Sequence, residues 1–83
     1  MTEVPIKIRF SKSLNNLLPS SLTQLDLSNN QMTLSDYTAS EVWANSQPAF
    51  TNPCNVYFNS NINSITGTNL EAILITKNCV IIA

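Results

Sequence analysis

The sequence predicts a small α/β domain built on a parallel sheet, and three observations lead to that class. Leu25–Asn30 and Val56–Asn61 share one frame, which we call the repeat frame: apolar, any residue, apolar, two polar residues, asparagine. A stretch with apolar residues at helical spacing follows each of them. Crossovers of the strand–helix–strand kind join parallel neighbours through right-handed connections.

The first two strands are expected near the N-terminus. In Ile6–Phe10, apolar residues alternate with lysine and arginine, which is the period of a strand with two different faces. The polar stretch Ser11–Asn16 then indicates a turn. A second strand is expected over Thr23–Ser28, with Leu25 and Leu27 directed into the core.

A helix should follow, with Ser35 as its N-cap and Asp36 in the first turn, where a negative charge is favourable. Pro48 should end it near Ser46, because the residue before a proline disfavours the helical conformation. Four apolar residues are expected to cover the sheet: Ala39, Val42, Trp43 and Phe50.

The second half repeats this order. Cys54–Phe58 reads as the third strand. Thr68-Asn-Leu-Glu71 is a capping box that opens a second helix, whose apolar face contains Leu70, Ile73 and Leu74. Asn78 should end that helix in the left-handed conformation, and Cys79–Ala83 forms a fourth strand.

The leucine spacing resembles that of a known family. Leu22, Leu25, Leu27 and Asn30 spell L-x-x-L-x-L-x-x-N, preceded by Leu18-Pro19-Ser-Ser, and this is similar to the bacterial and phage-type members of the leucine-rich repeat family. The resemblance implies a short α/β solenoid of about four parallel strands with two helices on one side. Residues 1–83 would form one domain, either a miniature array or the C-terminal end of a longer one. The repeat lengths are irregular: 17 residues separate Ile8 from Leu25, and the next two repeats take 31 and about 24 residues.

The same resemblance implies a binding surface. Residues between the core positions of each strand would face the concave, ligand-binding side, and here these are Lys7, Arg9, Gln24, Asp26, Asn55 and Tyr57. The leading hypothesis is therefore a non-enzymatic protein-interaction module. The alternative for these residues is a solvated sheet face on which Lys7 and Arg9 protect an exposed edge from pairing.

The last strand suggests a second surface. Val80, Ile81 and Ile82 place apolar side chains on both faces of a strand that nothing in the sequence covers. We expect a protein partner or a second copy of the chain to bury this edge. The competing function is a structural subunit or appendage of a larger assembly, such as a phage virion or a surface layer.

Several function classes find no support in the composition. Histidine is absent, only one glycine occurs and the acidic residues are scattered, so neither an enzyme nor a metal or cofactor site is expected. The net charge of −1, with 11% charged residues, excludes the basic footprint of a nucleic-acid-binding protein. No apolar run approaches the length of a membrane span.

Two questions stay open at this point. Cys54 and Cys79 either form a disulfide between neighbouring strands or act as two small buried hydrophobic residues. The abundance of asparagine, serine and threonine favours an extracellular, cell-surface or virion location over a cytoplasmic one.

Overall fold

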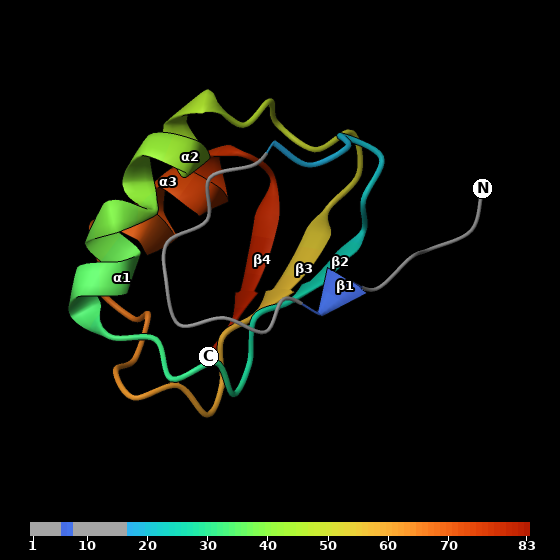
Figure 1. The fold of residues 1–83 in the computed structure, drawn as a ribbon. Helices are drawn as coiled ribbons and strands as arrows, with labels where there is room; N and C mark the ends of the chain where they lie inside the picture. Colours follow the sequence, from blue (N-terminus) through green and yellow to red (C-terminus); the bar gives the residue numbers. More distant parts are fainter. Residues whose placement is uncertain (1–5, 8–16) are drawn as a thin grey trace.

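A computed structural model describes residues 6–7 and 17–83, and Figure 1 shows its strands and helices. In chain order they are β1 (Ile6–Lys7), β2 (Gln24–Asp26), α1 (Leu34–Ala39), α2 (Glu41–Ser46), β3 (Cys54–Tyr57), α3 (Asn69–Thr76) and β4 (Cys79–Ile82). The expected α/β class with parallel strands is confirmed. The expectations for Ile8–Phe10 and Ser11–Asn16 lie outside the described residues.

Within the described residues the strands form one sheet in the order β1-β2-β3-β4, and every neighbouring pair is parallel. Leu25 lies beside Val56, as the repeat frame predicts. The alignment of Ile8 with Leu25 was wrong, because Leu25 pairs with Ile6. Alternation predicts which face of the sheet a residue occupies, but it does not determine the register between two strands. In β4 the register partner of Val56 is Ile81.

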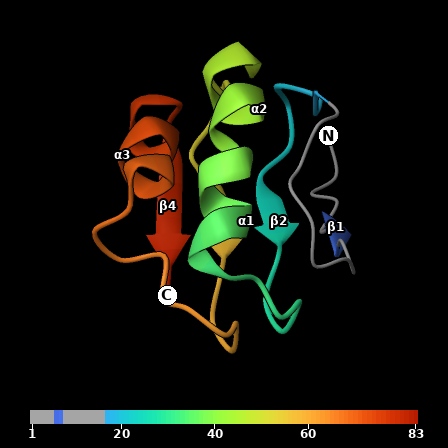
Figure 2. The same ribbon diagram turned by 60° about the vertical axis from the view of Figure 1, so that its left-hand side comes forward.

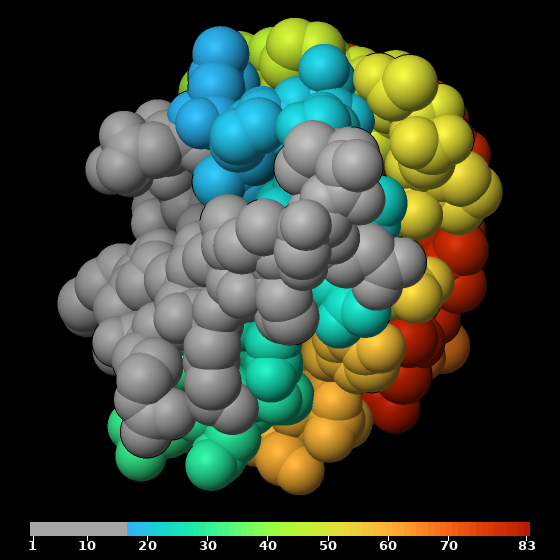
Figure 3. Space-filling model, turned by 90° about the vertical axis from the view of Figure 1, so that its right-hand side faces the viewer, coloured from blue at the N-terminus to red at the C-terminus, as the bar shows by residue number. Residues whose placement is uncertain are grey.

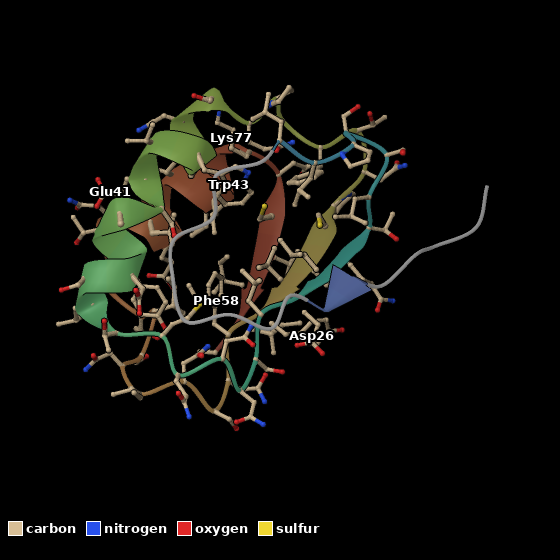
Figure 4. The ribbon with its side chains drawn as sticks, in the orientation of Figure 1. Asp26, Glu41, Trp43, Phe58 and Lys77 are labelled. Atoms are coloured by element: carbon tan, nitrogen blue, oxygen red, sulfur yellow. The ribbon has the colours of Figure 1, made fainter. Side chains whose placement is uncertain are left out.

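The helices cover one face of the sheet. Figure 2 shows α1 and α2 stacked end to end in front of the strands, with α3 beside them. The core lies between these layers, and Figure 4 shows Trp43 and Phe58 directed into it. The buried residues include Leu25, Leu27, Tyr37, Trp43, Phe50, Cys54, Val56, Phe58, Leu70 and Leu74. The expectation that Val42 and Ala39 cover the sheet was wrong, because Val42 is 75% exposed and Ala39 is also exposed.

The first helix begins earlier than expected and is divided in two. Thr33, not Ser35, is the N-cap, and Asp36 Oδ2 accepts hydrogen bonds from the Thr33 backbone N–H (2.9 Å) and hydroxyl (3.1 Å). Ser40 is fully buried and separates α1 from α2, its hydroxyl donating to the carbonyl of Asp36 (2.8 Å). A serine that bonds back to the preceding turn disturbs a helix at that point. The end of α2 at Ser46 is as predicted.

The caps of α3 agree well with the sequence. Thr68 Oγ1 accepts from the Glu71 N–H (3.2 Å), while the Glu71 carboxylate accepts from the N–H of Gly67 (2.8 Å), which lies just before the cap. Asn78 has φ 69°, the left-handed conformation expected after the helix. Thr68 therefore marks the start of α3, and Asn78 turns the chain directly before β4 begins at Cys79.

Candidate interaction surface

The face of the sheet away from the helices carries the candidate surface. Because Leu25 and Val56 are fully buried toward the helices, their neighbours along each strand project to the opposite face. Strand register arranges these neighbours in two rows, one of Gln24, Asn55 and Val80 and the other of Asp26, Tyr57 and Ile82. Figure 3 views the molecule from this side, where β2, β3 and β4 appear one beside another. We call these six residues the outer sheet face.

The outer sheet face changes character from one strand to the next. On β2 and β3 the rows consist of carboxylate, amide and phenol groups, all partly exposed. Asp26 is held in place by Ser28, whose backbone N–H (2.9 Å) and hydroxyl both donate to Oδ1. On β4 the rows end in isoleucine and in Val80, which is 47% exposed. The surface therefore offers hydrogen-bonding groups at one side and an apolar strip at the other.

Four of the six residues expected on the binding face lie there together: Gln24, Asp26, Asn55 and Tyr57. Lys7 lies in β1 in register with Asp26, and Arg9 is outside the described residues.

The apolar C-terminal residues lie on both faces of β4, as the sequence predicts. Ile81 pairs with Val56 and packs against the core, whereas Val80 and Ile82 belong to the outer sheet face. Their burial by a partner stays a prediction.

A second feature lies where the strands end. Asn61, in the turn after β3, joins two turns through its side chain. Its Nδ2 donates to the carbonyls of Leu27 (3.0 Å) and Phe58 (2.8 Å), while Oδ1 accepts from the N–H groups of Asn30 (2.9 Å) and Met32 (3.1 Å). Both N–H hydrogens and both oxygen lone pairs of the carboxamide therefore take part in hydrogen bonds. Only the parallel register brings these groups together, so the sequence alone did not reveal them.

The two turns are alike in backbone as well as in sequence. Asn29 has φ 57°, and Ser60, its counterpart in the repeat frame, has φ 64°. Asn63 joins the loop after β3 to α1: its Oδ1 accepts from the Leu34 N–H (3.1 Å), and its carbonyl accepts from the Tyr37 hydroxyl (2.6 Å). The shared frame seen in the sequence is therefore a structural repeat, joined by asparagine side chains.

The cysteines occur as free, buried thiols, the second of the two alternatives left open by the sequence. They face each other as register partners on β3 and β4. Burial raises the pKa of Cys54 to about 11. Burial, and then the nearby Cys54, raises the pKa of Cys79 to about 12. Both thiols are therefore protonated at neutral pH and poor nucleophiles.

The described part of the chain carries neither a metal-binding cluster nor a membrane-spanning helix. Residues 6–7 and 17–83 contain no group of three or more histidine, cysteine or acidic side chains placed to hold a metal ion. Over the same residues, none of the helices has the length and apolar character that crossing a membrane requires.

Comparison of the chain with models of known protein families, with curated protein sequences and with solved structures finds no match in any of the three.

Proposed function

We propose that this chain is a non-enzymatic protein-interaction module of leucine-rich-repeat type, which binds a partner protein through the outer sheet face. The observation that carries the proposal is the pair of in-register rows across β2, β3 and β4. Side chains from three strands, far apart in sequence, converge there on one surface that the helices leave uncovered.

The repeat interpretation rests on the structure of the turns. The two strand–turn units share register, a left-handed residue and the asparagine of the repeat frame. After each of β2 and β3 the chain returns through helices on the same side of the sheet, which is how a short solenoid is built (Figure 2). These features support the solenoid that the leucine spacing suggests.

The chemistry of the face favours a protein partner. Tyr57 lies between Asp26 and Ile82, and a tyrosine supplies a large contact area with little loss of conformational entropy. The carboxylate and amides on β2 and β3 can pair with backbone or basic groups, and the β4 strip can bury an apolar side chain. A segment lying across the strands would present its polar part to β2 and its apolar part to β4.

Comparative crosslinking in the native host tests this proposal. The wild-type chain, a Tyr57→Ser variant and a Val42→Ser control are each used as bait, the control changing an exposed apolar residue on α2. We expect Tyr57→Ser to lose the partner that wild type and Val42→Ser both retain. A partner set unchanged by Tyr57→Ser, or lost equally in the control, would refute the sheet-face function.

The second candidate, a structural subunit of a larger assembly, is favoured by one observation. β4 is an edge strand of the sheet, and Val80 on it is nearly half exposed. If copies associate through β4, a Val80→Lys variant should sediment as a monomer at concentrations where wild type forms oligomers. Wild type that stays monomeric at millimolar concentration contradicts the structural function.

A further inference from the structure

The two cysteines of the chain come from the two ends of one strand–helix–strand unit, and the fold brings them together. Cys54 is the first residue of β3, and Cys79 is the first residue of β4. They are register partners on parallel strands that lie side by side (Figure 1). Both side chains are buried in the core on the side of the sheet that the helices cover. The two thiols therefore project from neighbouring backbones in the same direction.

The spacing of paired strands puts these residues within reach of a disulfide. Neighbouring strands in a sheet lie about 4.8 Å apart. Disulfides join residues whose Cα atoms are about 4.4–6.8 Å apart. The pKa of Cys79 is raised by burial and then by the nearby Cys54, which agrees with this proximity of the thiols. The two backbones thus already have a separation that a disulfide spans.

Hydrogen bonds fasten the two strands together at this end. The Cys54 N–H donates to the carbonyl of Asn78, directly before Cys79 (3.0 Å). The Phe50 N–H donates to the carbonyl of Lys77 (2.9 Å), and Asn78 Nδ2 donates to the carbonyl of Phe50 (3.1 Å). Folding therefore holds the two thiols beside each other, whereas in the unfolded chain a long flexible segment separates them.

We propose that Cys54 and Cys79 form a reversible disulfide between β3 and β4 when the chain is exposed to a low-molecular-weight disulfide such as oxidised glutathione. The Cys79 thiolate attacks one glutathione sulfur and releases one reduced glutathione, since Cys79 is 7% exposed and Cys54 is fully buried. The Cys54 thiolate then attacks the Cys79 sulfur of this mixed disulfide and releases the second glutathione. The two cysteines lose two electrons to the glutathione disulfide, and their two protons end on the two glutathione thiols.

The bond would control how readily β4 separates from the sheet. It closes a loop that contains the turn after β3 and all of α3, and such a cross-link stabilises the folded state by restricting the unfolded chain. Because β4 also carries Val80 and Ile82, oxidation ties the apolar strip of the outer sheet face to β3. The proposal does not depend on whether that face binds a partner.

Burial determines how fast the bond forms. It raises the pKa of both thiols, so few thiolates are present at neutral pH. An oxidant reaches the sulfur atoms only when β4 separates transiently from β3. Oxidation should therefore be slow in buffer and faster in urea at concentrations below the unfolding transition.

A redox titration of the whole chain tests the proposal. The protein is equilibrated with mixtures of reduced and oxidised glutathione, once folded and once in concentrated urea, and free thiols are then blocked. Trypsin cleaves after Lys77 and separates the two cysteines, so a disulfide is detected by mass as peptide 78–83 linked to the peptide that ends at Lys77. The equilibrium constant for the disulfide should be at least about tenfold larger in the folded chain, and the oxidised chain should melt roughly 10 °C above the reduced one.

A Cys54→Ala variant is the control, because it cannot form the bond. It should melt at the same temperature in reduced and in oxidised glutathione, and the wild-type titration remains decisive if this variant does not fold. The proposal is overturned if the equilibrium constant is the same in the folded and unfolded chains. It is also overturned if oxidation yields only glutathione adducts, disulfide-linked dimers or unchanged thiols, even in urea below the unfolding transition.

Discussion

Replacing Asn61 by alanine removes four hydrogen bonds in one step. The Leu27 and Phe58 carbonyls lose a donor, and the Asn30 and Met32 N–H groups lose an acceptor. A hydrogen bond contributes about 0.5–1.5 kcal/mol net, and the lower half of that range applies to these partly buried groups. The expected loss of unfolding free energy is therefore about 3 kcal/mol.

That loss is large for a chain of this size. Proteins are stable by about 0.05–0.15 kcal/mol per residue, which for 83 residues is roughly 4–12 kcal/mol in total. At about 4–8 °C per kcal/mol, the Asn61→Ala variant should melt roughly 15 °C below wild type. Urea unfolding followed by circular dichroism and by Trp43 fluorescence measures the free energy, and a thermal scan measures the melting temperature.

The control is Asn59→Ala, the same change at a neighbouring position of the turn. The Asn59 side chain is exposed and makes no hydrogen bond within the described residues, so its loss should change the unfolding free energy by less than about 0.5 kcal/mol. A loss below about 1 kcal/mol for Asn61→Ala, or one no larger than that of the control, would show that this asparagine does not hold the turns together.

Three further changes test other parts of the structure. Gln47 is fully buried, and its side chain bonds both the N–H and the carbonyl of Leu18 at 2.8 Å, so Gln47→Ala should cost about 2 kcal/mol in urea unfolding and reduce hydrogen-exchange protection at Leu18. Gly67 has φ +82° with nothing within 4 Å of an added Cβ, so Gly67→Ala should cost only the left-handed strain, about 1 kcal/mol by the same assay. Burial raises the pKa of Cys54 to about 11 and of Cys79 to about 12, so the unfolded chain loses these protons first. Stability should therefore fall as pH rises from the ordinary thiol value near 9 through that range, and a Cys54→Ala/Cys79→Ala variant should show a shallower decline.

Features encoded by neighbouring residues were predictable from the sequence. The α3 N-cap at Thr68 and the left-handed Asn78 depend on residues within one helical turn, and both occur as expected. The repeat frame was also predictable, because both of its copies are present in the chain. It places Leu25 beside Val56 in the structure.

Features that depend on distant partners were not predictable. The register between β1 and β2 places Ile6 rather than Ile8 beside Leu25, and the alternation of apolar residues is compatible with either register. The break at Ser40 depends on burial of a serine within the stretch that was expected to be one helix. For the candidate surface, the polar residues on β2 and β3 were placed correctly. Val80 and Ile82 were expected as part of an edge strand and were not assigned to this face, where strand register places them.

The bridging role of Asn61 bears on how the chain folds while it is being synthesised. The turn after β2 (Leu27–Asn30), which we call the first turn, obtains hydrogen-bond partners from Asn61, a residue that is synthesised later. These hydrogen bonds therefore cannot form when β2 first leaves the ribosome. Until Asn61 emerges, the groups of the first turn remain bonded to water and Leu25 lacks its neighbour Val56. Folding from the N-terminus therefore has to wait for the second unit, and a nascent chain stalled before Asn61 should remain sensitive to protease at β2.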